Sequence, residues 1–329
     1  MNLPDKTDRQ GSPATIGPDD WPRVCVFGAG AVGCFHGARF AQAGAPVTLI
    51  GRPAHVDAIR AQGLRFDSGG VTCHIPIDAS VEPGPVRDAD LVLFCVKTRD
   101  TEAGARTIAP LLRPGAVVVS LQNGVDNADR LREAAGIDAL AAVVYVATSM
   151  AGPGHLLHSG RGDLVIGEVL PGRSRERAAR VAAWFERAGV PCPVSSDVRA
   201  ALWTKLAMNC AFNAISALGR ARYVRMIESL EVRATMRDLL EECAAVARAQ
   251  GIALAEVDAL YASAIALGEA MRQQTSSTAQ DIAAGRPTEI DALNGLVARH
   301  GAALGVPTPV NRALHALVRL LETGDRTPG

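Results

Sequence analysis

A polar stripe on an otherwise apolar helix is the feature of this sequence that points most directly to chemistry. Lys205, Asn209 and Asn213 are spaced four residues apart within the helical pattern of residues 198–218. At about 100° per residue, they lie on one slowly drifting face. The rest of the segment is apolar nearly all round, which is typical of a buried helix. Unpaired buried amides and ammonium groups are costly, so either the same domain or a polar ligand must supply partners.

The lysine of this stripe is unusual because the chain contains so few. Of 34 basic residues, all but three are arginine. Lys6 lies in a polar N-terminal segment, and Lys97 closes an apolar, strand-like run. Arginine stays protonated at any accessible pH, whereas burial lowers the pKa of a lysine and lets it release a proton. Lys205 is therefore the first candidate for a chemical role, with chance retention of one lysine as the alternative.

Glu289 is a second candidate, in the helical pattern that begins near Thr288. The apolar face of that pattern consists of Ile290, Leu293, Leu296, Val297 and Leu304. Glu289 projects close to the middle of this face, so we expect it to point inward and either pair with Lys205 or hold a substrate hydroxyl. The alternative is a first-turn acid that suits the helix dipole. Upstream, Ser276 and Ser277 interrupt the preceding helix and could bind a carboxylate or cap a helix.

A glycine-rich turn predicts a dinucleotide site near the N-terminus. The sequence GAGAVG, which fits GxGxxG, comprises Gly28, Ala29, Gly30, Ala31, Val32 and Gly33. It follows an apolar run at 24–27 and opens a helical stretch, the context that gives this pattern meaning. The first glycine allows a tight turn, the second lets a pyrophosphate approach the backbone, and the third lets helix and strand pack closely. A purely structural glycine turn is the alternative.

Basic and amide residues follow the later apolar runs of the sequence, and they indicate which dinucleotide binds. An NAD site usually carries an acid after the second strand, but here Arg52 offers a cation for a 2′-phosphate, which favours NADP(H). Asp57, the nearest acid downstream, lies in a helical stretch and is expected to be a solvated surface charge. Lys97 and Asn123 follow later strands, at the edge where such sheets bind ligands. The alternative to a binding role is a solvated strand end for Lys97 and a plain turn for Asn123 and Gly124.

The elements that position these residues are predicted by hydrophobic patterns. Four near-continuous apolar runs lie at 24–27, 47–50, 91–96 and 117–121, with helical stretches such as 34–43 and 101–112 between them. Continuous rather than alternating hydrophobicity indicates strands that are buried on both faces of a parallel sheet. We predict an α/β fold with a Rossmann-type doubly wound parallel sheet. Shorter, partly antiparallel strands are expected at about 140–148, 155–158 and 163–167, followed by a helix at about 174–188 and a short strand at 191–196.

Beyond Asp197 the pattern becomes helical. Candidate helices lie at about 198–218, 228–250, 256–284, 288–304 and 309–322. We therefore predict an NADP-binding Rossmann domain at 22–197 and an all-helical domain for substrate binding and catalysis at 198–325. Residues 1–21, rich in Pro, Gly and Asp, are predicted to be a disordered tail.

Composition argues against several other classes of protein. The 329 residues carry no net charge, and no basic stripe predicts nucleic acid or a membrane surface as a partner. No apolar run reaches the roughly 18 residues of a membrane helix, and no secretory signal is present. Seven scattered cysteines without CxxC spacing predict buried thiols in a reducing compartment and no metal site. We expect a soluble cytoplasmic protein, monomeric or homodimeric.

Together these motifs resemble the ketopantoate reductase (2-dehydropantoate 2-reductase) family from about Val24 to Leu321. The resemblance rests on GAGAVG, CVKT (95–98), QNG (122–124), WTKLAMNCAFNAISAL (203–218), SSTAQDI (276–282) and TEIDALNG (288–295). It implies a Rossmann domain followed by a helical domain, with the active site between them. The implied activity is NADPH-dependent reduction of 2-dehydropantoate, a 2-oxo acid, to pantoate in pantothenate and coenzyme A biosynthesis.

The resemblance also implies roles for single residues. Lys205 would donate the proton, while Glu289 would aid substrate placement and the ionisation of the lysine. The 2-oxo acid would be held by Asn209, Asn213 and Ser277. The NADPH would be contacted by Arg52, Lys97 and Asn123.

Three departures from the family pattern leave the substrate open. Residues 217–226 read ALGRARYVRM, where better-known members have a shorter, more apolar stretch with a further substrate-binding asparagine nearby. SSTAQDI replaces the typical SSMLQDI, and Gln274 stands where asparagine is frequent. One alternative is therefore a reductase of another 2-oxo or 3-oxo acid on the same fold. A further alternative is a non-catalytic protein that senses NADPH.

Overall fold

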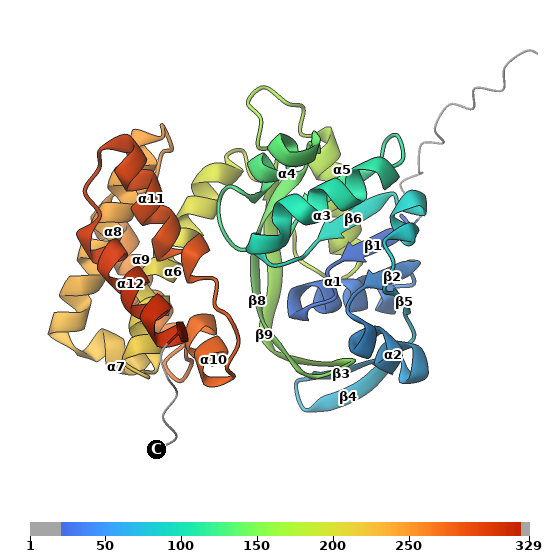
Figure 1. Cartoon of the computed structure of the whole chain (residues 1–329), viewed down its shortest axis with the longest axis horizontal. Coiled ribbons are helices and arrows are strands. Elements are labelled where there is room, and N and C mark those ends of the chain that lie inside the picture. The colour runs from blue at the N-terminus through green and yellow to red at the C-terminus, as the bar shows by residue number, and fades with distance from the viewer. Residues whose placement is uncertain (1–20, 324–329) are drawn as a thin grey trace, which may run out of the picture.

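The computed structural model describes residues 21–323, which form a sheet flanked by helices and a helical region beside it (Figure 1). The predicted disordered tail lies outside these residues except for Trp21. The ring of Trp21 packs edge-on against Phe40, with 6.1 Å between the ring centroids. The last two residues of the predicted helical domain, 324–325, also lie outside the described range.

The sheet in the described part of the chain has nine strands. Their bounds are β1 Val24–Phe27, β2 Val47–Ile50, β3 Leu64–Ser68, β4 Val71–Ile75, β5 Asp78–Ser80, β6 Leu91–Phe94, β7 Val117–Ser120, β8 Leu140–Gly152 and β9 His155–Gly167. The order is β4-β3-β9-β8-β7-β6-β1-β2-β5, and all neighbours from β8 to β5 run parallel. The predicted Rossmann-type doubly wound sheet is therefore confirmed, with β1, β2, β6 and β7 formed by the four predicted apolar runs.

The last strands of the sheet differ from the prediction. In place of three short strands, β8 and β9 are 13 residues each and pair as one long antiparallel hairpin. Three register shifts interrupt their ladder. These shifts and the glycines of β9 break the alternating pattern in the sequence without breaking the pairing. The predicted strand at 191–196 contributes only an isolated bridge between Val194 and Ile166.

Strands β3, β4 and β5 were not predicted, because they are short and largely polar. The hairpin of β3 and β4 turns at Gly69–Gly70, both with positive φ, and most of β4 is exposed or only partly buried. β4 and β5 are the two edge strands and β3 is next to one of them, so these strands lack the continuous hydrophobicity that marks the central strands.

Helices cover both faces of the sheet, as Figure 1 shows. Helices α1 Ala31–Gln42, α2 Pro53–Gln62 and α5 Glu176–Arg187 share a core with one face. Helices α3 Thr101–Ile108 and α4 Asn127–Ala135 share a core with the other. This arrangement explains why the central strands are apolar on both sides.

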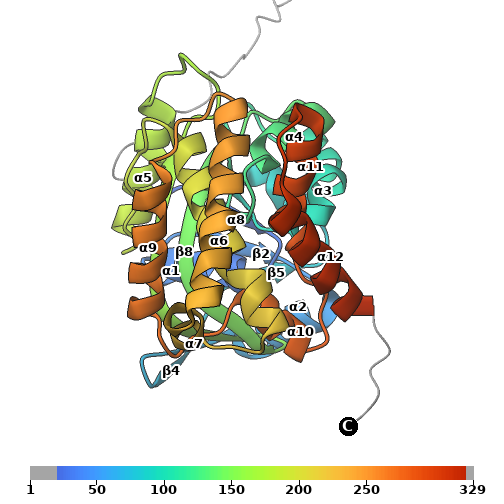
Figure 2. The same cartoon turned by 90° about the vertical axis from the view of Figure 1, so that its left-hand side faces the viewer.

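The C-terminal region is helical, and α6 lies at its centre (Figure 2). Its helices are α6 Val198–Leu218, α7 Tyr223–Glu228, α8 Leu230–Ala249, α9 Val257–Ala270, α10 Ser277–Ala283, α11 Asn294–Leu304 and α12 Pro309–Thr323. The predicted helix at 256–284 is thus two helices, α9 and α10, because the chain turns before the cap at Ser276. The predicted helix at 288–304 begins only at Asn294, after a 3-10 turn at Ile290–Ala292.

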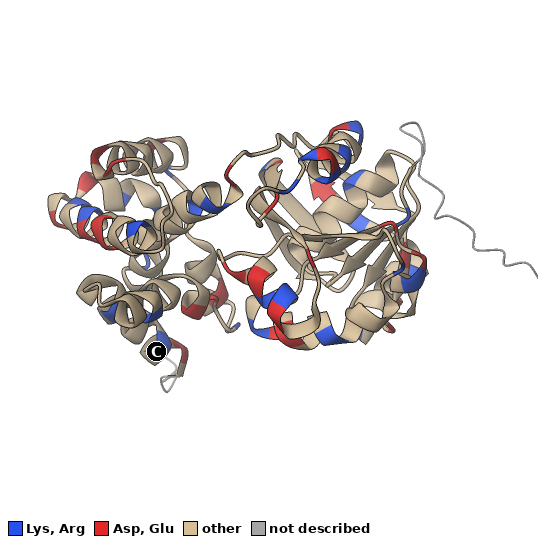
Figure 3. Ribbon diagram, turned by 90° about the horizontal axis from the view of Figure 1, so that it is seen from above, with Lys and Arg blue, Asp and Glu red and all other residues tan. Residues whose placement is uncertain are grey.

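Acidic and basic residues are interspersed over both regions (Figure 3). Within residues 21–323, no helix combines the length and the apolar character that crossing a membrane requires.

Candidate active site

The glycine-rich turn between β1 and α1 has the shape of a phosphate cradle. Gly28 has φ +110°, and a Cβ there would lie 2.7 Å from the backbone carbon of Cys95. A Cβ on Gly33 would lie 2.4 Å from the carbonyl oxygen of Gly28, whereas a Cβ on Gly30 would meet nothing within 4 Å. Packing therefore requires the first and third glycines, and the second borders open space. The residues present fit a dinucleotide pyrophosphate.

Arg52 stands at the end of β2, immediately before α2, and is exposed. Its side chain makes no hydrogen bond or ion pair with any described residue. Asp57, on the exposed side of α2, has no such partner among them either. A free guanidinium at this edge of the sheet fits a 2′-phosphate better than a 2′-hydroxyl.

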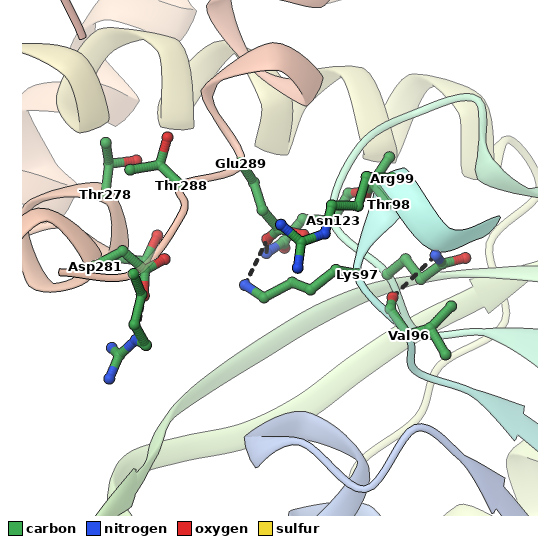
Figure 4. A network of polar contacts seen from close by, with 12 residues as sticks. Val96, Lys97, Thr98, Arg99, Asn123, Thr278, Asp281, Thr288 and Glu289 are labelled. Atoms are coloured by element: carbon green, nitrogen blue, oxygen red, sulfur yellow. Dashed lines mark hydrogen bonds and ion pairs between the residues drawn. The ribbon is translucent and has the colours of Figure 1, made fainter. Parts of the chain in front are cut away.

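The loops that follow β6 and β7 are held together by hydrogen bonds. Thr98 donates its Oγ1 hydrogen to the carbonyl oxygen of Asn123 at 2.9 Å, and Asn127 Nδ2 donates to the same oxygen at 2.7 Å. Gln122 Nε2 donates to the carbonyl oxygen of Val96 at 3.0 Å (Figure 4). These bonds hold the backbone at Asn123, the point from which its side chain projects. The sequence argument missed Thr98, Gln122 and Asn127, although the first two belong to the CVKT and QNG motifs.

Glu289 reaches this edge of the sheet from the helical region. Its Oε2 accepts a hydrogen bond from Asn123 Nδ2 at 3.1 Å and lies 3.5 Å from Lys97 Nζ (Figure 4). The Glu289 side chain is 17% exposed and that of Lys97 is 54% exposed. Glu289 does point inward, but the predicted reason was wrong. It lies in the loop before the 3-10 turn, so loop geometry rather than a helix face directs its side chain.

Lys205 lies where α6 meets β8. Its Nζ donates to Asn123 Oδ1 at 2.9 Å and to the carbonyl oxygen of Val144 at 2.6 Å. The ammonium has three hydrogens, so one remains for another acceptor. Burial lowers the pKa of Lys205 to about 8, the charge of Glu289 acts to raise it, and the charge of Arg161 acts to lower it. Lys205 and Glu289 form no direct ion pair, and Asn123 lies between them.

The remainder of the stripe lies along the same helix. Asn209 lines a small pocket together with Lys205, Asn123 and neighbouring residues. Asn213 is buried, and its Nδ2 lies 3.3 Å from Ser277 Oγ and 3.3 Å from Thr278 Oγ1. Internal contacts with α10 therefore satisfy the end of the stripe, while Lys205 keeps a free hydrogen.

The two serines before α10 have different environments. Ser276 is the cap, because its Oγ accepts from Ala279 N at 3.1 Å and donates to the carbonyl oxygen of Asn213 at 3.1 Å. Ser277 is exposed, and its hydroxyl contacts the Asn213 amide. The site thus contains an ammonium with a lowered pKa, bound to Asn123 at the sheet edge where β1, β6 and β7 end and where β1 leads into the glycine-rich turn.

Comparisons with known proteins agree with this geometry. The family described as ketopantoate reductase PanE/ApbA matches residues 24–171, and its C-terminal counterpart matches residues 197–322. A 2-dehydropantoate 2-reductase of Halobacterium salinarum is 33% identical over 307 residues, covering 91% of this chain and 99% of the relative.

Two solved structures are also similar to this chain. The PanE/ApbA family ketopantoate reductase from Ralstonia eutropha is 51% identical, with a TM-score of 0.84 and coverage of 91% of this chain and 98% of that one. D-mandelate dehydrogenase, solved with NADH and anilino(oxo)acetate, is 25% identical, with the same TM-score of 0.84 and coverage of 91% and 98%.

Proposed function

Because this chain belongs to the ketopantoate reductase family, we propose that it reduces 2-dehydropantoate to pantoate with NADPH, in pantothenate and coenzyme A biosynthesis. The observation that carries this proposal is the environment of Lys205. Its ammonium is held by Asn123 and Val144 at the ligand-binding edge of the sheet and keeps one hydrogen for a substrate. The name of the Halobacterium relative, 2-dehydropantoate 2-reductase, supports the choice of reaction.

NADP(H) is the proposed cofactor. The open space at Gly30 supports a pyrophosphate contact, and Arg52, which has no side-chain partner within residues 21–323, supports a 2′-phosphate contact. Lys97 and Asn123 would lie along the same cofactor. Bound in its reduced form, the cofactor supplies a hydride to the carbonyl carbon of the substrate. The chain must then hold the substrate, exclude water and provide a proton.

Lys205 provides that proton. Its free Nζ hydrogen would point to the substrate carbonyl oxygen, and its positive charge would stabilise the negative charge that develops there. As the oxygen is protonated, the Nζ–H bond breaks and the lysine becomes a neutral amine. A pKa of about 8 places the lysine near working pH, where general acids are most effective.

The remaining site residues would position the substrate. Glu289 would accept a hydrogen bond from a substrate hydroxyl, in exchange for its present contact with Asn123 or Lys97. The carboxylate of the 2-oxo acid would be bound by Asn209, Asn213 and Ser277, with Asn213 giving up its present contact with Ser277 Oγ.

The segment after α6 favours a second candidate, a reductase of another 2-oxo or 3-oxo acid. Tyr223 N donates to the carbonyl oxygen of Gln274 at 3.0 Å, and Val224 N donates to that of Arg272 at 3.1 Å. Residues 217–226, which differ from the family pattern, therefore hold the chain just before α10. Helix α10 carries Ser277. A change in the segment would therefore move Ser277 and change the shape of the site around the bound 2-oxo acid. The similarity to D-mandelate dehydrogenase makes an aryl 2-oxo acid worth testing.

A steady-state screen tests the proposal. The purified chain is assayed with NADPH and with NADH against 2-dehydropantoate, pyruvate, phenylglyoxylate and acetoacetate. We expect the highest kcat/KM for 2-dehydropantoate with NADPH. A higher value for another acid would support the second candidate, and NADPH binding without turnover of any acid would support a non-catalytic sensor.

We also propose a cytoplasmic location for the enzyme. All seven cysteines are free, which is compatible with a cytoplasmic location. We propose a monomer or a homodimer.

A further inference from the structure

An irregularity in β9 lies beside the Lys205 site. In the ladder with β8, Asp163 pairs with Tyr145 and Arg161 pairs with Val146, so Gly162 is an extra residue between them. Arg161 has φ +54°, a left-handed backbone that residues other than glycine rarely adopt. Bulges of this kind often redirect a side chain next to a functional site.

The bulge is accompanied by an unusual placement of the Arg161 side chain. Its guanidinium carbon lies 4.2 Å from the centroid of the Tyr145 ring. Asp163 holds the guanidinium through two hydrogen bonds, 3.0 Å from Nε to Oδ1 and 2.7 Å from Nη2 to Oδ2. The Nζ of Lys205 is 5.8 Å from the centroid of the same ring. Two cations therefore share one aromatic ring, and one of them is the proposed proton donor.

The other groups that face Lys205 come from three elements. Tyr145 belongs to β8, Arg161 and Asp163 to β9, and Glu289 to the loop before α11, joined to the lysine through Asn123. Lys97 faces Glu289 from the loop after β6. On α10, which packs against α6, Asp281 is paired with Arg286. Glu289 attracts the proton on Lys205, and Arg161 repels it.

We propose that Arg161 is a positioning residue for Lys205, which holds a fixed positive charge on the Tyr145 ring beside the lysine and offsets the attraction of Glu289. The proposal rests on the proton-donor role of Lys205 stated above. Without Arg161, Lys205 would hold its proton more tightly. Its ammonium would then be a weaker acid in the reduction, and at a given pH less of the lysine would be the neutral amine that the reverse reaction needs.

The small number of lysines allows a direct test that needs no substrate. In protein labelled with 13C and 15N at lysine, Lys205→Arg identifies the Lys205 Cε signal, and its pH titration gives the midpoint. In Arg161→Gln we expect that midpoint to rise by roughly half a unit to one unit. Arg161→Gly suits the left-handed backbone and should give the same shift even if glutamine disturbs the bulge. An unchanged midpoint in both variants overturns the proposal.

Arg65 offers a matched control. On β3 it pairs with Asp67 two residues later through its own Nε and Nη2, as Arg161 pairs with Asp163. Arg65→Gln removes the same kind of ion pair from the same sheet. We expect the Lys205 midpoint to stay unchanged in this variant, and a shift equal to that of Arg161→Gln would overturn a specific role for Arg161.

Kinetics then separate positioning from substrate contact. In Arg161→Gln, the alkaline limb of the kcat profile for reduction should move to higher pH by the same amount, with KM for the 2-oxo acid within about twofold. Arg161→Lys, which keeps the charge, should restore the original limb. A large rise in KM with no movement of the limb would contradict the proposal. If the wild-type chain reduces no 2-oxo acid, the proposed function fails, but the NMR comparison still decides the role of Arg161.

Discussion

Lys205 and Glu289, the proposed acid and the proposed substrate-placing carboxylate, are joined through the amide of Asn123. The amide oxygen accepts from the lysine at 2.9 Å, and the amide nitrogen donates to the glutamate at 3.1 Å. A cation on one side and an anion on the other determine which way the amide faces. The sheet region thus contributes the group that connects two residues of the helical region.

Replacing Lys205 with arginine tests the proton donor. The charge is kept, but arginine does not release a proton at accessible pH, so we expect kcat to fall by about 10²–10⁴-fold. NADPH affinity, measured by fluorescence titration, should stay within about threefold. Lys97→Arg is the control, since Lys97 is proposed to bind rather than to react, and it should keep most of the turnover. Near-normal kcat in Lys205→Arg would disprove the assignment.

Removing the Asn123 side chain tests the connection between Lys205 and Glu289. Asn123→Ala leaves the lysine without one acceptor and the glutamate without one donor, and we expect kcat to fall by about 10–100-fold. Thr98→Val, which removes only a hydrogen bond to the Asn123 backbone, should have a smaller effect. Single-turnover kinetics with NADPH already bound measure the rate of reduction of the 2-oxo acid. Equal losses in the two variants would show that loop position, not the amide, matters.

The lowered pKa of Lys205 predicts opposite pH profiles for the two directions of reaction. Reduction needs the protonated amine, so kcat should be level below about pH 7 and fall about tenfold per pH unit well above the pKa of about 8. Oxidation of the 2-hydroxy acid needs the neutral amine, so its kcat should rise through the same range. Profiles measured in both directions check this, and profiles of the same sign would contradict it.

Arg52→Ala tests the choice of cofactor. A charge-assisted hydrogen bond contributes about 1.5–3 kcal/mol, so we expect the Kd for NADPH to rise by about 10–100-fold and that for NADH by less than about threefold. Asp57→Ala serves as the control on the neighbouring helix and should leave both affinities unchanged. Comparable losses for NADPH and NADH in Arg52→Ala would reject the 2′-phosphate contact.

The two serines before α10 should separate stability from binding. Ser276→Ala removes the cap and a hydrogen bond to α6, so we expect the free energy of unfolding to fall by about 1–2 kcal/mol in urea titrations. Ser277→Ala should leave stability nearly unchanged and raise KM for the 2-oxo acid by about tenfold. The reverse pattern would show that Ser277 supports the fold and Ser276 binds the substrate.

The sequence predicted those parts of the fold that depend on local patterns. Continuous apolar runs identified the central parallel strands, and helical periodicity identified α6 over its whole length. Because parallel strands end at a common edge, the same reasoning brought Lys97 and Asn123 to one side of the sheet. The roles of these residues toward NADPH stay predictions.

Features that depend on contacts between distant segments could not be predicted. Glu289 was expected on a helix face, but its direction follows from a loop that the packing of α11 determines. The left-handed Arg161 lies in a bulge, and the register of a long hairpin cannot be deduced from alternation that the bulge itself interrupts. The central place of Asn123 depends on both regions at once.

The sequence separations within the site have a consequence for folding. Asn123 is 82 residues from Lys205 and 166 residues from Glu289. Contacts between such distant segments form late, because long loops must close first and domains tend to fold in the order of their synthesis. A nascent chain can therefore complete its dinucleotide turn well before it acquires a working acid. The proposed acid and the proposed substrate-placing carboxylate would both meet Asn123 only late in assembly.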